Sequence, residues 1–116
     1  MNRKRELRVT DYLQHILDAI ERIESYLADS DEQTFAQSFM AQDAVIRNLE
    51  IIGEAAIKIR SLDAATAEKY PEWDQICGMR NRLIHGYFDI NLEIVWRTVQ
   101  NDLPKFRKHV KSILAP

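Results

Sequence analysis

Apolar residues recur every three or four positions along this chain, the spacing that places side chains on one face of an α-helix. The first helix is expected to begin at Thr10 or Asp11, since either residue can cap a helix N-terminus. Its apolar positions are Leu13, Ile16, Leu17, Ile20, Ile23 and Leu27. A second apolar run, capped by Ser30 or Asp31, continues without a breaker to about Arg60 and predicts the longest helix of the protein.

Two shorter segments follow the long helix. A short helix is expected over residues 64–69, and the next helix should run from Pro71 to His85, because proline suits a first helical turn. Gly86 is the residue type that most often ends a helix in the left-handed conformation. His85 is therefore placed at a helix C-terminus.

The last helix can be capped by Asp89 or Asn91, and Pro104 within its long apolar stripe predicts a kink. We find no internal repeat and no alternating strand pattern. The pattern predicts an all-α fold, an antiparallel bundle of four main helices plus one short helix. It should form a single domain over residues 1–116 with a helical core at about 8–114.

Small residues gather in the middle of the predicted second helix. Gly53 and the two alanines after Glu54 remove side-chain bulk, so another helix can approach closely there. Glu54 itself is open to two interpretations. Its carboxylate is either partly buried and paired with Arg80 or Arg82, or exposed to solvent.

Composition agrees with a helical, globular protein, since three glycines and three prolines supply few turns. No apolar run approaches the roughly 20 residues that span a bilayer, and no apolar signal core follows the N-terminus. We expect a cytoplasmic protein without a membrane segment. Cys77 is the single cysteine, and a buried, unreactive thiol is expected.

Charge is segregated along the chain although the formal net charge is only −2. Residues 1–9 carry +3, residues 10–79 carry −9 and residues 80–116 carry +4. The basic C-terminal block includes a run that could follow an RNA backbone or form a solvated helix face: Lys105, Arg107, Lys108 and Lys111. The blocks could equally pair with each other or with a second chain.

Residues 80–87 combine a cation, an imidazole, a helix-ending glycine and a phenol. A guanidinium matches the geometry of a phosphate, and imidazole exchanges protons near neutral pH. This combination indicates RNA phosphodiester cleavage without a metal, with His85 as acid or base and Arg80 as phosphate clamp. Asn81 would position one of them by a hydrogen bond, and Tyr87 is available for stacking or phosphate binding.

The spacing of Arg80 and His85 sets a geometric condition on such a site. Five positions on an ideal helix separate two side chains by about 140°. The two groups can converge only if the last turn is distorted or if the arginine bends toward the imidazole. One imidazole also leaves a second proton transfer unassigned, so we expect a homodimer that places two copies of residues 80–87 in one cleft.

The residues just described resemble the HEPN superfamily of ribonucleases. The signature of that superfamily is an arginine, a polar residue, and a histidine four to six residues beyond the arginine, which Arg80, Asn81 and His85 match. The match extends through Gly86-Tyr87-Phe88-Asp89-Ile90 and the upstream segment at residues 47–55, which are similar to the HepT-like toxins.

This resemblance implies a homodimeric toxin of a type VII-like HEPN/MNT toxin–antitoxin pair, which cleaves RNA through Arg80 and His85 and needs no cofactor or metal. It also implies a minimal nucleotidyltransferase antitoxin as partner. In this family the antitoxin is thought to transfer AMP to the tyrosine that matches Tyr87. The added phosphate and adenosine would block RNA and compete for the cation.

Other interpretations stay open from the sequence. The same cations could belong to a non-catalytic helical module that holds nucleotide or docks a nucleotidyltransferase, or the chain could be a purely structural dimerisation bundle. Arg82 is expected to face solvent or contact RNA. His15 and His109 are interpreted as solvated surface residues without a role.

Overall fold

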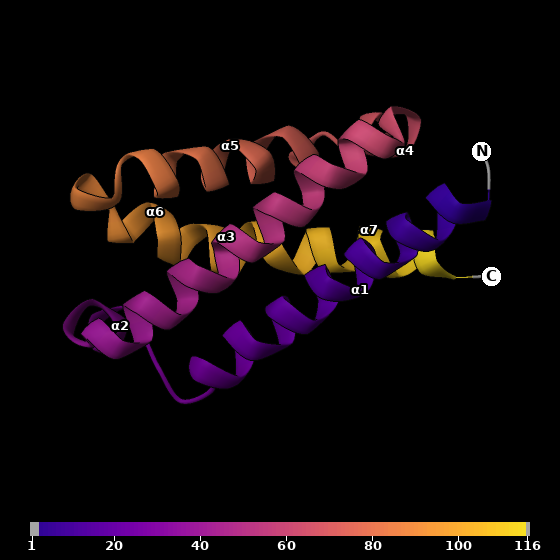
Figure 1. Cartoon of the computed structure of the whole chain (residues 1–116). Coiled ribbons are helices and arrows are strands. Elements are labelled where there is room, and N and C mark those ends of the chain that lie inside the picture. The colour runs from indigo at the N-terminus through magenta and orange to yellow at the C-terminus, as the bar shows by residue number, and fades with distance from the viewer. Residues whose placement is uncertain (1–2, 116) are drawn as a thin grey trace.

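A computed structural model describes residues 3–115, apart from the side chain of Tyr87, and these residues form helices joined by short connections, with no strand (Figure 1). In chain order the elements are α1 (Arg3–Tyr26), α2 (Glu32–Gln37), α3 (Phe39–Leu62), α4 (Ala64–Glu68), α5 (Glu72–His85), the 3₁₀ turn η1 (Tyr87–Asp89), α6 (Leu92–Arg97), the π-helical turn η2 (Thr98–Asp102) and α7 (Leu103–Leu114). The predicted all-α class is confirmed.

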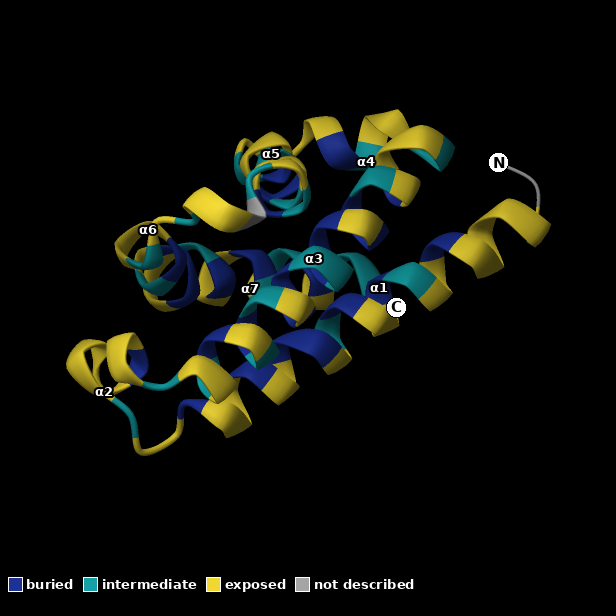
Figure 2. Cartoon of the chain, turned by 60° about the vertical axis from the view of Figure 1, so that its left-hand side comes forward, coloured by how far each residue is buried: buried dark blue, intermediate teal, exposed yellow. Residues whose placement is uncertain are grey.

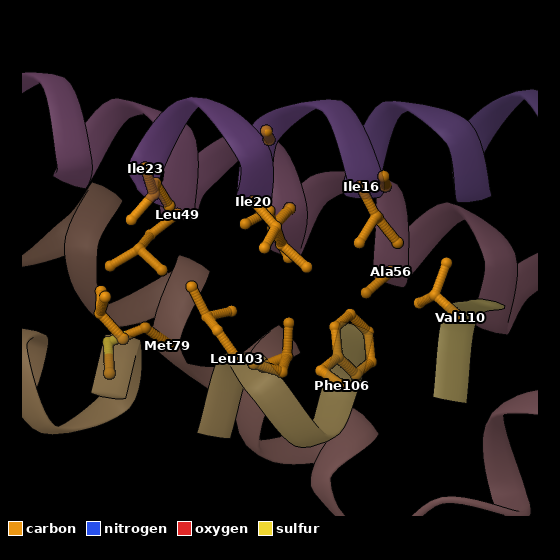
Figure 3. Close-up of a cluster of buried hydrophobic side chains, with 14 of the residues drawn as sticks. Ile16, Ile20, Ile23, Leu49, Ala56, Met79, Leu103, Phe106 and Val110 are labelled. Atoms are coloured by element: carbon orange, nitrogen blue, oxygen red, sulfur yellow. The ribbon is translucent and has the colours of Figure 1, made fainter. Parts of the chain in front are cut away.

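The long helices pack as an antiparallel bundle around one apolar core. α3 lies against both α1 and α5, and α7 returns along α1. Figure 2 shows the buried faces turned inward and the exposed faces outward. The side chains that meet in the core, drawn in Figure 3, include Ile16, Ile20, Ile23, Leu49, Ala56, Met79, Leu103, Phe106 and Val110. No helix within residues 3–115 combines the length and the apolarity needed to cross a membrane.

The first helix begins at Arg3, well before the predicted start at Thr10 or Asp11. The Thr10 hydroxyl donates a hydrogen bond to the carbonyl of Glu6 (3.0 Å), one turn back, instead of capping an N-terminus. Val9 is buried and extends the apolar face of α1 toward its start. Good helix-forming residues before this position then allow the helix to continue outward.

The predicted second helix is divided in two. Asp31 caps α2, as expected, but the backbone becomes extended at Ser38, whose hydroxyl accepts a hydrogen bond from the amide of Ala41 (3.1 Å) and caps α3. The break lets Phe35 of α2 turn into the core, where it is buried. The buried side-chain amide of Gln42 donates to the carbonyls of Phe35 (3.0 Å) and Ala36 (3.1 Å) and so ties the end of α2 to the start of α3.

Trp73 attaches α5 to the rest of the bundle. Its side chain is buried, its indole nitrogen donates to the carbonyl of Ala56 in α3 (2.9 Å), and its ring meets Phe106 of α7 edge-on, with centroids 5.0 Å apart. A buried indole that keeps its hydrogen bond contributes packing without an unpaired donor. The side chain therefore fixes where the first turn of α5 lies, and the later turns of α5, residues 80–85, carry the predicted site.

The C-terminal helical run starts at Asn91, whose side chain caps α6 through the amides of the next turn. The interruption predicted at Pro104 takes the form of η2, in which the amide of Leu103 bonds to the carbonyl of Thr98. A proline lacks an N–H and crowds the carbonyl four residues before it. The wider π turn accommodates this defect, so α7 can begin with Pro104 in its first turn.

Candidate functional site

The last turn of α5 is regular and ends without a left-handed residue. Gly86 has φ −116° and ψ 36°, so the expected left-handed end is wrong. Its amide bonds to the carbonyl of Arg82 (2.9 Å), and its own carbonyl accepts from the amide of Asp89 (2.9 Å) in η1. The 3₁₀ turn satisfies these end groups, which removes the need for a left-handed residue.

Arg80 is half-buried where α5 crosses α3. A Cβ atom placed on Gly53 would overlap the Cβ of Arg80, so the helices approach closely only because residue 53 has no side chain. This confirms the close approach predicted from the small residues of the second helix. The backbone of α3 therefore supports the aliphatic stem of the arginine.

The guanidinium of Arg80 keeps unused hydrogen-bonding capacity. Its Nη1 donates to the Asn81 Oδ1 (3.1 Å), which is a hydrogen bond of the kind expected for the asparagine. Its Nε is buried and has no hydrogen-bond partner in the described part of the chain. A buried donor without a partner is costly, and an anion can reach it only if the arginine side chain changes its rotamer.

His85 is exposed on the last turn of the same helix. Because α5 stays regular through this residue, helix geometry keeps the imidazole about 140° around the axis from Arg80. The distorted helix end that could have brought the two groups together is absent. Arg82 is three positions before His85 and is its neighbour on the helix surface, and it too is exposed.

Glu54 is exposed, and the ion pairs within residues 3–115 do not join it to Arg80 or Arg82. It borders a hollow of about 170 Å³ together with His15 and Lys58 on the α1–α3 side of the bundle. Of the two interpretations of Glu54, the structure therefore agrees with the solvent-exposed carboxylate. Tyr87, the predicted modification site, lies outside the described side chains.

His109 has partners that sequence spacing does not reveal. Its ring stacks on Tyr70 with centroids 4.3 Å apart, and its Nδ1 contacts a carboxylate oxygen of Glu72. The expectation of a solvated His109 is therefore wrong, because the start of α5 packs on α7. Within residues 3–115, no cluster of three or more His, Cys, Asp or Glu side chains has the geometry of a metal site.

The basic C-terminal run is partly used inside the bundle. The Nη1 of Arg107 in α7 donates to both carboxylate oxygens of Glu24 in α1, at 2.5 and 2.6 Å. The positive and negative blocks of the sequence thus pair with each other at this position. The contact leaves fewer free cations on α7 for an RNA backbone.

Comparison with known proteins places these features in a family. Residues 16–113 match the model of a family described as Ribonuclease HepT-like. The "Probable ribonuclease HepT" of Thermococcus cleftensis is 38% identical over 84% of this chain and 87% of its own length. The "mRNA nuclease HepT" of Shewanella oneidensis is 29% identical over 83% of this chain and 88% of its own length.

A longer relative contains the same region as part of a larger chain. The "Gamma-glutamylcyclotransferase and putative RNase MJ0434" of Methanocaldococcus jannaschii is 43% identical over 89% of this chain, which spans 46% of that relative. No solved structure matches the chain.

Proposed function

Because the chain belongs to the HepT-like ribonuclease family, we propose that it is a metal-independent endoribonuclease and the toxin of a HEPN/MNT toxin–antitoxin pair. One observation carries the proposal. The C-terminal half of α5 carries an exposed imidazole, His85, and a half-buried guanidinium, Arg80, whose Nε has no partner within the described residues. These are the groups that proton transfer and phosphate binding require.

The proposed reaction uses the 2′-hydroxyl of the substrate as nucleophile. An imidazole removes its proton, the 2′ oxygen attacks the adjacent phosphorus, and the bond from phosphorus to the 5′ oxygen breaks. A second group returns a proton to that leaving oxygen, which gives a 2′,3′-cyclic phosphate and a 5′-hydroxyl end. Arg80 stabilises the negative charge that develops on the phosphoryl oxygens, and Asn81 holds its guanidinium.

The site is completed by a second copy of the chain. The regular end of α5 keeps Arg80 and His85 apart within one protomer. Apposing two α5 ends across a twofold axis brings the Arg80 of one protomer toward the His85 of its partner. The same arrangement supplies two imidazoles, one for each proton transfer.

A minimal nucleotidyltransferase antitoxin is the proposed partner in the cell, and Tyr87 is the proposed acceptor of AMP. The backbone of Tyr87 opens η1, directly after His85 and Gly86. An adenylyl group on this residue would add negative charge and bulk next to the cations that hold RNA. Modification would therefore silence the nuclease without unfolding it.

The first test is His85→Ala, with His15→Ala as the matched control because His15 is also an exposed helical histidine. Loss of the imidazole should lower the rate of RNA cleavage by at least about a hundredfold, the usual size of a general acid–base contribution. The control should cleave at the parent rate. A gel assay on labelled RNA, with circular dichroism to verify folding, measures both.

Two results would contradict this assignment. A folded His85→Ala protein that cleaves as fast as the parent would remove His85 from the mechanism. Cleavage that stops in EDTA and returns with a divalent ion would show that a metal, and not this pair of side chains, performs the reaction.

A second candidate is a non-catalytic module that holds nucleotide or docks a nucleotidyltransferase. The separation of Arg80 and His85 within one chain favours it, because binding a phosphate needs no adjacent imidazole. In that case Arg80→Ala would weaken nucleotide binding, His85→Ala would leave binding unchanged, and RNA would stay intact.

A further inference from the structure

A groove separates α5 from α6 and η2, on a side of α5 different from the one that packs on α3. It consists of two hollows of about 160 and 220 Å³ that share Met79, Arg82 and Ile94, so they are adjacent. We call it the α5–α6 groove. In Figure 1 its walls are the two helices drawn one above the other at the left of the molecule.

The α5–α6 groove has an apolar floor, and its edges carry two arginines, Arg82 and Arg97, and two aspartates, Asp89 and Asp102. Met79 and Ile76 of α5 and Ile94 of α6 line it with apolar side chains. The exposed side chains of Arg82 and Arg97 line it too, and neither forms an ion pair within residues 3–115. An apolar surface beside unpaired guanidiniums suits a ligand with a flat ring and a phosphate.

The π turn adds hydrogen-bonding groups at one end. Asn101 and Asp102 of η2 line the larger hollow, while Asp89 lies in the smaller one. An amide and a carboxylate are the side chains that read the donor and acceptor edges of bases. A π turn also places its side chains where a regular helix would not, and such turns are frequent at functional sites.

The α5–α6 groove reaches the proposed catalytic residue along one helix. Arg82 borders both hollows, and it precedes His85 by three positions, which on a helix surface makes them neighbours. A chain bound along the groove would therefore pass within one helical turn of the imidazole.

From this arrangement we infer that the α5–α6 groove is an RNA subsite, which binds one unstacked nucleotide next to the bond that is cut. Arg82 and Arg97 hold its phosphate, the base lies on Met79 and Ile94, and Asn101 reads the base edge. The inference rests on the proposed ribonuclease function. It names the nucleotide of the substrate that sets the sequence preference of the nuclease.

The dimensions favour a single base over other ligands. Neither hollow alone reaches the roughly 300 Å³ at which small-molecule pockets begin, and a nucleotide can occupy both, with its base in one and its phosphate in the other. Sequence-specific recognition of RNA commonly takes this form, with a splayed base held by stacking and by hydrogen bonds to its edges. A protein partner would need a broader, flatter contact than this groove offers.

The test separates phosphate binding from base reading. Binding of the four homopolymeric oligoribonucleotides is measured by fluorescence polarisation over a series of salt concentrations, in the His85→Ala background so that no RNA is cut. The variants Arg82→Ala and Asn101→Ala are compared with Arg8→Ala. The control removes the same charge as Arg82→Ala from an exposed position in the first two turns of α1. The start of α1 lies at the end of the molecule opposite α6 (Figures 1 and 2).

Arg82→Ala should weaken binding of all four RNAs to a similar degree and lower the salt slope by about 0.7, the loss of one phosphate contact. Asn101→Ala should keep the salt slope but reduce the preference among the four bases by about tenfold. Arg8→Ala should change neither quantity.

Unchanged affinity and unchanged preference in both groove variants would overturn the subsite. Loss of a co-expressed nucleotidyltransferase from these variants, with RNA binding intact, would overturn it too and assign the groove to a protein partner. Cleavage by wild-type protein is measured in parallel. Absence of cleavage would contradict the ribonuclease proposal, whereas the binding series would still decide the groove.

Discussion

At the residue scale, the side chains of α5 divide into those held by the fold and those left to solvent. The stem of Arg80 is supported by Gly53 of α3, while His85 is exposed on the final turn. Cys77 belongs to the first group. It is buried, and burial raises the pKa of its thiol.

Cys77 should therefore be unreactive in the native protein. A raised pKa keeps the thiol protonated at neutral pH, and the nucleophilic thiolate becomes still rarer as pH falls. We expect a thiol reagent such as DTNB to react slowly in native buffer and rapidly in urea. Native protein that reacts at the rate of a free thiol would show that this part of α5 opens readily.

At the scale of elements, the relation between α3 and α5 depends on one missing side chain. A Cβ added to Gly53 would meet the Cβ of Arg80, which is fixed to the helix backbone and cannot rotate away. Gly78, on α5, provides a natural contrast because a Cβ there has no heavy atom within 4 Å. Alanine substitution at each glycine in turn therefore separates the steric effect of an added Cβ from its effect on helix propensity.

Gly53→Ala should destabilise the protein by about 1–3 kcal/mol, since overpacking outweighs the helix propensity gained. It should also lower RNA cleavage, because α5 must shift and carry Arg80 with it. Gly78→Ala should instead be neutral or stabilising by up to about 1 kcal/mol. Urea unfolding measures both, and equal stability of the two variants would refute the close contact.

The break between α2 and α3 is a second feature of this scale. Ser38→Ala removes the hydroxyl that accepts from the amide of Ala41, and it should cost about 1 kcal/mol of unfolding free energy. Ser112→Ala is the control, because Ser112 is an exposed residue within α7 and alanine is the better helix former. If the Ser112→Ala protein unfolded at a lower temperature than the Ser38→Ala protein, the capping role of Ser38 would be contradicted.

At the scale of the whole molecule, the bundle places the end of α5 at the surface, so a second chain can reach it. Arg80→Ala and His85→Ala should each be inactive alone. When the two are unfolded together and refolded as a mixture, half the dimers are mixed, and one of their two sites keeps both groups. We expect at most about a quarter of the parent activity, because the complete Arg80–His85 pair of a mixed dimer lacks the second imidazole.

The mixing experiment also discriminates where the site lies. No recovery of RNA cleavage, with mixed dimers verified by native mass spectrometry, would contradict a site that needs only the Arg80 of one protomer and the His85 of its partner. Either both imidazoles are then essential, or the arginine bends toward the imidazole within one chain.

Much of the fold could be predicted because it depends on local periodicity. The apolar spacing located the helices of residues 64–69 and 71–85 closely, and Asn91 and Asp31 were among the predicted caps. The split at Ser38 could not be predicted in this way. Its cause is the burial of Phe35 and the hydrogen bond from Gln42, both of which exist only after the bundle has formed.

The sequence by itself determined the helical class and the pattern of the core, because helix periodicity is a local property of the chain. Side-chain chemistry is local too, and it singled out Arg80, Asn81 and His85 as the candidate site. Only the tertiary structure decided that α5 stays regular to His85 and that Arg80 rests on Gly53. The α5–α6 groove is equally a product of packing. These features depend on contacts between residues far apart in sequence, which no local pattern specifies.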